Sequence, residues 1–258
     1  MNILFTLCGR AGSKGVKGKN ARDFLNIPLV WYSMAGIYLF CKKHDALYDN
    51  VKVVLNTDSE ELKTLVSQVS DLEVEILHRE EYLAGDKVPK TAVILDSLIR
   101  AEILFNMDFD IVVDLDITSP LRKVEDIVHA VVRKIERPEV NVVYSVAPSR
   151  RNPYFNMVKE ANGFFCDAFP STYTTRQEAP VFYDMNASIY AYSALKLKTL
   201  DLVTFFNTYC DAIVMQDTGI LDIDSEEDYE LMQVIAKYLF ENKAGYSQVY
   251  NKAVSWSK

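Results

Sequence analysis

The chain has 258 residues, of which 49% are hydrophobic and 25% are charged, and its formal net charge is −8. This balance is ordinary for a soluble globular protein, and the length allows one large domain with a complete hydrophobic core. The acidic charge excludes bulk binding of nucleic acid, which requires a basic face, but it leaves room for a local basic site that binds a small anion.

The cysteines and histidines do not form a metal-binding pattern. No C-x-x-C pair occurs, and the three histidines are scattered along the chain. The cysteines are therefore expected to be reduced, as in a cytoplasmic enzyme, rather than to bind zinc. No signal peptide is expected, and the apolar stretch 27–40 is too short to span a membrane, so it is predicted to be a buried helix.

Apolar runs alternate with helical patterns along the first half of the chain. Strands are predicted over residues 3–7, 51–55, 74–77, 111–115 and 142–146. Helices are predicted over residues 28–41, 60–69, 90–105 and 123–136. Continuous apolar strands in β-α-β alternation indicate an α/β fold with a doubly wound, mostly parallel sheet.

The alternation ends near residue 147. Proline-rich and polar sequence over about 148–186 is interpreted as an inserted loop-and-strand region. Strands are predicted again over 188–192 and 212–215, and an amphipathic helix near 226–241. The chain is therefore expected to form one domain over residues 1–258, in which the last stretch is either a short packed helix or a partly free tail.

The stretch LCGRAGSKGVKGKN, residues 7–20, follows the first predicted strand and is rich in glycine and cations, without one acid. Glycine lets backbone N–H groups converge on a phosphate, and ligands of open α/β sheets bind beyond the carboxyl ends of strands. The spacing matches neither the P-loop GxxxxGK[ST] nor the dinucleotide-binding GxGxxG, which argues against P-loop kinases and dehydrogenases. A nucleotide-phosphate site is predicted here; the alternative is a solvated basic loop.

Asp222 and Asp224 form a D-x-D pair near the end of the chain. In an extended segment their Cα atoms lie roughly 6.6 Å apart on one face, so both carboxylates can share a hard cation such as Mg2+. The alternative is that Asp224 or Ser225 only caps the following helix.

A second pair, Asp114 and Asp116, ends the strand before the turn T-S-P at residues 118–120. The hydroxyls of this turn can donate hydrogen bonds to a ligand, although a plain strand-turn-helix junction is equally compatible. Arg176 can pair with a carboxylate or phosphate, and Asn186 can read a sugar hydroxyl, but each is also compatible with a structural role.

Together these segments resemble the cytidylyltransferases that activate nine-carbon acidic sugars: the CMP-sialic acid synthetase (acylneuraminate cytidylyltransferase) family with its legionaminic and pseudaminic acid relatives. Residues 9–20 follow the family motif A-R-x-x-S-K-G-x-x-x-K-N, with glycine in place of the first alanine. The further matches occur in the family's order: NTDSEE at 56–61, TSPLR at 118–122, RQ at 176–177, NASIY at 186–190 and DIDSEEDYEL at 222–231. The resemblance covers about residues 1–240.

The resemblance implies a Rossmann-like, GT-A-like nucleotidyltransferase fold and assigns roles to individual residues. Nucleotide binding is expected at Arg10, Ala11, Gly12, Ser13, Lys14, Lys19, Asn20 and Arg79. Sugar binding is expected at Asp116, Thr118, Ser119, Arg122, Arg176, Gln177 and Asn186. Catalytic roles are expected for Arg10, Lys14, Asp116 and Asp224, and Mg2+ is expected on Asp222 and Asp224.

The implied reaction joins an acidic nonulosonic sugar to CTP, with release of pyrophosphate, in the biosynthesis of cell-surface glycans. The insertion is expected to form a homodimer and to reach the partner's site. Asp116 is one hypothesis for the general base, and a metal-bound hydroxide is the other. Asp184 stands where sialic-acid enzymes can have an arginine, which argues against N-acetylneuraminate itself.

Three other functions remain as alternatives. The nearest are a nucleotide-sugar-dependent glycosyltransferase, which also uses a D-x-D pair, and another sugar nucleotidyltransferase of the Kdo type. The third is a non-catalytic nucleotide-binding protein, which has no need of the Asp222 and Asp224 pair.

Overall fold

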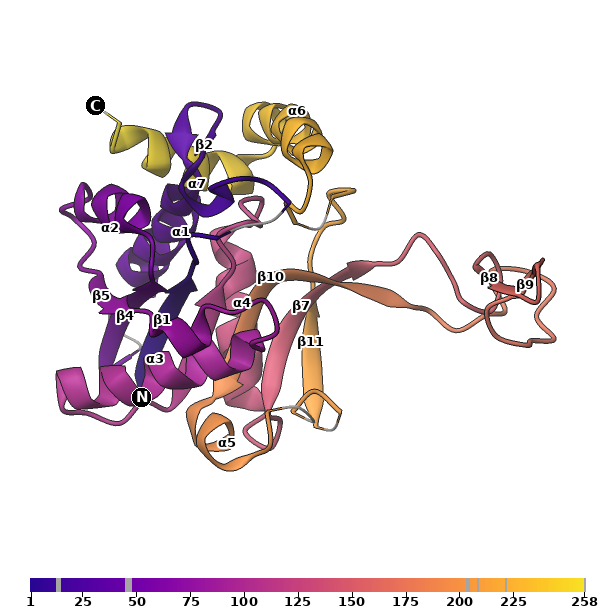
Figure 1. Cartoon of the computed structure of the whole chain (residues 1–258), viewed down its shortest axis with the longest axis horizontal. Helices are drawn as coiled ribbons and strands as arrows, with labels where there is room; N and C mark the ends of the chain where they lie inside the picture. The colour runs from indigo at the N-terminus through magenta and orange to yellow at the C-terminus, as the bar shows by residue number, and fades with distance from the viewer. Residues whose placement is uncertain (13–14, 45–47, 203–204, 208, 221, 258) are drawn as a thin grey trace.

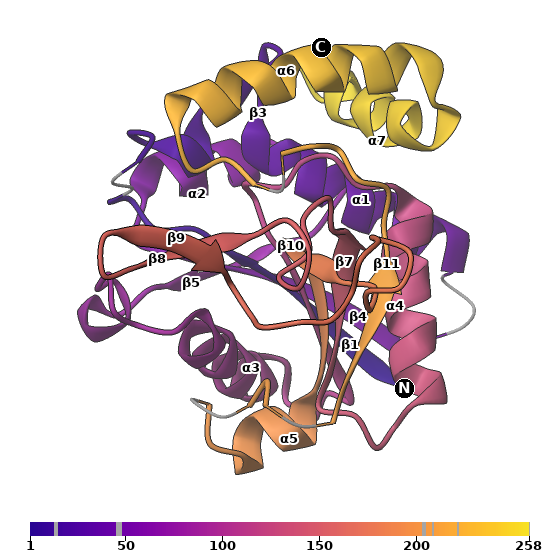
Figure 2. The same cartoon turned by 90° about the vertical axis from the view of Figure 1, so that its right-hand side faces the viewer.

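The computed structural model describes residues 1–12, 15–44, 48–202, 205–207, 209–220 and 222–257. A seven-stranded sheet in the order β11-β7-β10-β6-β1-β4-β5 runs through the molecule, and helices cover both of its faces (Figures 1 and 2). The α/β fold with a mostly parallel sheet that the sequence predicts is therefore confirmed.

The sheet strands are β1 (Asn2–Cys8), β4 (Asn50–Thr57), β5 (Glu75–His78), β6 (Ile111–Leu115), β7 (Val142–Pro148), β10 (Tyr183–Ser193) and β11 (Cys210–Val214). All neighbouring pairs are parallel except those of β10, which runs antiparallel to both β6 and β7. β1 is buried on both faces and pairs with β4 on one side and β6 on the other. The chain proceeds from β1 to β4 and β5 on one side, and then returns to β6 on the other side of β1. Sheets of this kind bind ligands at the carboxyl ends of the strands beside such a reversal, here β1 and β6.

Two hydrophobic cores lie on opposite faces of the sheet. The larger is made with α1 (Leu29–His44), α2 (Glu60–Ser67), α4 (Val124–Glu136), α6 (Glu226–Asn242) and α7 (Ala244–Ser255). The smaller is made with α3 (Lys90–Phe105) and α5 (Ala194–Thr199) (Figure 2). Among the described helices, none combines the length and the apolarity needed to cross a membrane.

The termini of several elements follow from local sequence. Ser59 caps α2 by accepting a hydrogen bond from the Leu62 N–H, as its position before two acids predicts. Pro28 ends the short strand β3 (Ile27–Pro28), which pairs with β2 (Asp23–Phe24), and α1 begins one residue later than predicted. The last stretch of the chain, left open by the sequence, forms α7 and packs on α1, with Trp256 against Trp31.

The predicted insertion forms an arm that extends from the ends of β7 and β10, away from the sheet (Figure 1). At its far end β8 (Val158–Ala161) and β9 (Phe164–Asp167) pair as an antiparallel hairpin in which every residue is exposed. Large apolar side chains of the arm, such as Phe164 and Phe165, are therefore open to solvent.

One buried arginine fixes the turn after β6. The Arg122 guanidinium, which is 1% exposed, donates to the Ser33 hydroxyl on α1 at 3.0 Å and to the Ser188 hydroxyl on β10 at 3.1 Å. It also donates to the backbone carbonyls of Asp116 and Ser119. Arg122 thus ties a helix, a strand and the turn together just behind the edge of the sheet.

We expect Arg122→Met to lower the free energy of unfolding by about 3 kcal/mol or more, because it leaves several buried oxygens without a donor. Arg150→Met is the control, since Arg150 is 73% exposed and its ion pair with Asp217 contributes less than about 1 kcal/mol. Urea unfolding measures both variants. Equal midpoints for the two would contradict the structural role given to Arg122.

Candidate active site

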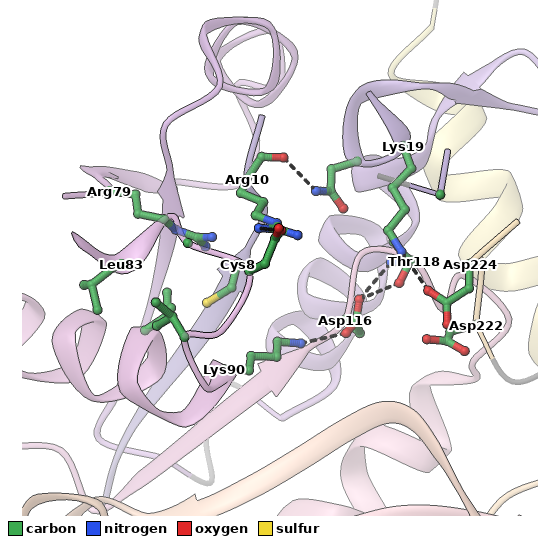
Figure 3. A pocket seen from close by; sticks show the side chains of 16 residues that line it. Cys8, Arg10, Lys19, Arg79, Leu83, Lys90, Asp116, Thr118, Asp222 and Asp224 are labelled. Atoms are coloured by element: carbon green, nitrogen blue, oxygen red, sulfur yellow. Dashed lines mark hydrogen bonds and ion pairs between the residues drawn. The ribbon is translucent and has the colours of Figure 1, made fainter. Parts of the chain in front are cut away.

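A cleft of about 440 Å³ opens at the carboxyl ends of β1 and β6 (Figure 3). It gathers residues from the opening loop, from the segment before α3, from the turn after β6 and from the segment before α6. Eight of the residues predicted from the sequence line it: Arg10, Lys19, Asn20, Arg79, Asp116, Thr118, Asp222 and Asp224.

The opening loop touches the D-x-D segment directly. A Cβ atom on Gly15 would lie 2.0 Å from the backbone oxygen of Asp224, so only glycine allows this approach. Lys19 donates to the Ile223 carbonyl at 2.7 Å and pairs with the Asp224 carboxylate at 3.1 Å. Gly18 turns the chain before Lys19 with a positive φ of 64°.

Arg10 is held between the loop and the segment before α3. Its guanidinium pairs with Asp86 at 2.7 Å and donates to the Ala84 carbonyl at 3.2 Å. The Asn20 amide donates to the Arg10 carbonyl at 3.1 Å, which closes the loop on itself. Asn20 is therefore a brace of the loop as well as part of the cleft wall.

Arg79 forms part of the cleft lining although its side chain is buried. Its Nε donates to the Asn56 side chain at 3.0 Å and its Nη2 to the Asn56 carbonyl at 2.9 Å. These bonds fix the guanidinium in place while Nη1 stays without a hydrogen-bond partner in the described part of the chain. A fixed cation of this kind suits an anionic ligand.

Asp222 and Asp224 both face the cleft, and the helix cap is made by a different residue. Ser225 caps α6 in a capping box with Asp228, so the cap does not need Asp224. Burial and the nearby carboxylates of Asp224 and Asp116 raise the pKa of Asp222 to about 6. Asp222 makes no hydrogen bond or ion pair with the described residues.

The chemistry of this pair fits a hard divalent cation, which prefers carboxylate oxygens. No group of three or more acidic, histidine or cysteine side chains suited to a metal occurs among the described residues. A cation on Asp222 and Asp224 would therefore complete its ligand sphere with oxygens of the substrate and water, as Mg2+ does at phosphate sites.

Lys90, which the sequence did not single out, joins the two acids that end β6. Its Nζ lies 2.7 Å from Asp114 Oδ2 and 2.7 Å from Asp116 Oδ2. Asp114 is fully buried and also accepts a hydrogen bond from Thr6. Burial would raise the pKa of Asp116, but Lys90 and the hydrogen bonds from Thr118 lower it to about 2. Asp116 is therefore a weak base. The Thr118 hydroxyl donates a hydrogen bond to it at 2.8 Å.

A second, largely apolar cavity of about 520 Å³ lies next to the cleft. Its wall includes Met185 and the stacked rings of Tyr190 and Tyr192 on β10, whose centroids are 5.9 Å apart. The rest of the wall is formed by Lys87, Pro89, Lys90, Thr91, Leu202 and Phe206, and of these Lys90 also lines the cleft. We name this cavity the aromatic pocket. It meets the cleft at the Lys90 side chain, which lines both.

The remaining predicted residues do not line the cleft. Ser119, Arg122 and Asn186 are buried; Asn186 accepts a hydrogen bond from Ser145 and contacts the Met215 sulfur. Arg176 and Gln177 are exposed on the arm, where Arg176 donates to backbone carbonyls of the arm's base. Ala11 and Gly12 are exposed in the opening loop, and the Ala11 N–H donates to the Asp58 carboxylate. Ser13 and Lys14 lie outside the described residues.

Comparison with known proteins agrees with this arrangement. The model of the family described as cytidylyltransferase matches residues 7–242. The chain is 38% identical to CMP-N,N′-diacetyllegionaminic acid synthase of Campylobacter jejuni over 90% of its length and 94% of the relative's. It is 36% identical to post-translational flagellin modification protein B of Campylobacter coli over 91% of its length and 95% of the relative's.

The fold is also shared with a solved structure of CMP:2-keto-3-deoxy-manno-octonic acid synthetase complexed with CTP. The TM-score is 0.63 at 15% sequence identity, and the match covers 92% of this chain and 99% of the other. The cleft lies at the carboxyl ends of β1 and β6, the glycine-rich cationic loop lies beside the D-x-D segment, and the family model matches most of the chain. These findings lead to one conclusion: this protein belongs to the cytidylyltransferase family.

Proposed function

We propose that this chain transfers the CMP group of CTP to an acidic nonulosonic sugar, a nine-carbon 2-keto acid, and releases pyrophosphate. The observation that carries the proposal is the cleft itself. It sets Arg10 and Arg79 on one side of a cavity of about 440 Å³ and Asp222 and Asp224 on the other, where Lys19 pairs with Asp224 (Figure 3). Cations on one side and a carboxylate pair on the other suit a triphosphate with its metal ion.

The triphosphate would lie over the opening loop. Arg10, Lys19 and Arg79 offset its charge, and the buried, hydrogen-bonded Arg79 supplies a donor that does not need to reorganise. Asp222 and Asp224 would hold Mg2+. When bound, Mg2+ neutralises phosphate charge and orients the leaving pyrophosphate.

The sugar would lie across Lys90, with its acyl substituents against the aromatic pocket. Met185, Tyr190 and Tyr192 present an apolar surface that suits methyl groups of N-acetyl substituents. The C. jejuni relative is named for a diacetylated legionaminic acid. We therefore favour N,N′-diacetyllegionaminic acid as the sugar.

In the reaction, the anomeric hydroxyl oxygen of the sugar bonds to the α-phosphorus, the bond from that phosphorus to the bridging oxygen breaks, pyrophosphate leaves, and the hydroxyl proton passes to water. Asp116, held ionised by Lys90 and Thr118, accepts a hydrogen bond from this hydroxyl and orients it. With a pKa of about 2 it is poorly suited to act as the general base, so its contribution is positioning.

The arm is proposed to make a homodimer. Its hairpin exposes Phe164 and Phe165 at 77% and 75%, and a surface of this kind is normally covered by a partner. The four cysteines form no disulfide bonds with one another, which suits the cytoplasm, where we place the reaction.

Incubation with CTP, Mg2+ and a panel of acidic sugars tests the proposed reaction. We expect pyrophosphate release with CTP and N,N′-diacetyllegionaminic acid, and much less with ATP, GTP or UTP. Mass spectrometry of the product identifies the CMP-sugar. Absence of release with CTP and every 2-keto acid in the panel would refute the proposed function.

Asp222→Asn and Asp224→Asn are each expected to lower kcat/KM by about a thousandfold, because metal ions contribute several kcal/mol to such transition states. Glu227→Gln is the control, because Glu227 is an exposed acid in the first turn of α6. Thermal unfolding checks that all three variants fold. Turnover of the Asp222 or Asp224 variant within tenfold of the control would remove the metal role.

Phe164→Asp combined with Phe165→Asp is expected to turn a dimer into a monomer, because charges replace the exposed apolar surface of the hairpin. Lys159→Gln with Glu160→Gln, on the same hairpin, is the control and should leave the mass unchanged. Sedimentation equilibrium measures the mass. A monomeric wild-type chain, or a dimeric Phe164 and Phe165 variant, would contradict the role of the arm.

A further inference from the structure

Lys90 occupies a position that no other described residue shares. It is the first residue of α3, and it is the one described residue that lines both the cleft and the aromatic pocket. If the nucleotide occupies the cleft and the sugar the aromatic pocket, the bond between them forms beside Lys90. Figure 3 shows its side chain pointing across the cleft floor toward Asp116.

The ammonium group of Lys90 is held by two carboxylates, but these do not occupy all of its N–H donors. It lies 2.7 Å from one oxygen of Asp114 and 2.7 Å from one oxygen of Asp116. An ammonium has three N–H donors, so one remains for a ligand. The Lys90 side chain is 36% exposed and lines both cavities, whereas the Asp114 side chain is fully buried behind it.

The ligand chemistry at this junction is set by the substrate class. In a 2-keto acid sugar the carboxylate is attached to the same carbon as the attacking anomeric hydroxyl. A sugar whose hydroxyl is oriented by Asp116 therefore brings its carboxylate to within reach of the neighbouring cation. The cations that we assign to the triphosphate are different residues: Arg10 and Lys19 come from the opening loop and Arg79 follows β5.

We propose that Lys90 binds the carboxylate on the anomeric carbon of the sugar and thereby selects 2-keto acids over neutral sugars. This inference rests on the proposed function and deepens it. Lys90 would act with Asp116 as one unit: Asp116 accepts from the hydroxyl, and the free N–H of Lys90 donates to the carboxylate one carbon away. A neutral sugar would leave that donor unpaired at the reaction centre.

Direct removal of Lys90 would leave Asp114 buried without its ion pair, which can unfold the chain. The test therefore compares Asp114→Asn, which retains the ammonium, with the double variant Asp114→Asn/Lys90→Gln, which lacks it. Lys90→Arg in the wild-type background retains the charge and serves as the conservative variant. Initial rates of pyrophosphate release give KM for N,N′-diacetyllegionaminic acid and for CTP, and calorimetry gives the Kd of CTP with Mg2+.

We expect the double variant to raise the KM of the acidic sugar by about 10- to 100-fold relative to Asp114→Asn, as for loss of one charged hydrogen bond. The Kd of CTP should change less than about twofold, and Lys90→Arg should recover most of the sugar affinity. With the carboxamide analogue of the sugar, the difference in kcat/KM between the two enzymes should be several-fold smaller than with the acidic sugar, because the charge of the carboxylate is absent and mainly the effect on Asp116 remains.

Two results would overturn the role of Lys90: an unchanged KM for the acidic sugar, or a CTP Kd that rises as much as the sugar KM, which would make Lys90 a nucleotide ligand. Failure of the proposed function looks different. In that case the wild-type chain itself releases no pyrophosphate from CTP with any acidic sugar.

Discussion

The site depends on one close approach between segments about 200 residues apart. Gly15 has no side chain, and the backbone of Asp224 lies where a Cβ would be, so the cationic loop and the carboxylate pair share one cavity. Lys19 closes the contact from the loop side through the Ile223 carbonyl and the Asp224 carboxylate. This contact brings Lys19, Asp222 and Asp224 to one side of the cavity, across from Arg10 and Arg79, and it accounts for the glycine and the cation at these positions of the loop.

The sheet brings the segments of the site together, and buried charged residues fix the orientation of its side chains. β1 and β6 end side by side, so the opening loop and the turn after β6 meet without any further device. Behind them Arg122 ties the turn to α1 and β10, and Lys90 holds Asp114 and Asp116 in one orientation. Groups that are fixed in this way before substrate arrives do not have to reorganise during the reaction, which is the main source of catalysis in transfers of this kind.

The sequence was sufficient for the fold class, for the position of the loop and for the Asp222 and Asp224 pair, because each depends on local patterns of apolar, glycine and acidic residues. It was not sufficient where a role depends on contacts between distant segments. In the sequence, Lys90 is one of two lysines in the polar segment 79–90, and only the start of α3 brings it to the end of β6. Arg122 belongs to a motif for which the sequence predicts sugar binding. In the structure its guanidinium instead donates hydrogen bonds to protein oxygens, including that of the distant Ser33. Only the packing of α1, β6 and β10 shows that difference.

The central claim is that one triphosphate lies between the opening loop and the D-x-D pair. A crystal structure with CTP and Mn2+, in which anomalous scattering locates the metal, tests it most directly. The account predicts a manganese peak bound by Asp222, Asp224 and triphosphate oxygens, with Arg10 and Lys19 against the phosphates. A triphosphate bound outside the cleft, or a manganese ion away from both aspartates, would contradict it.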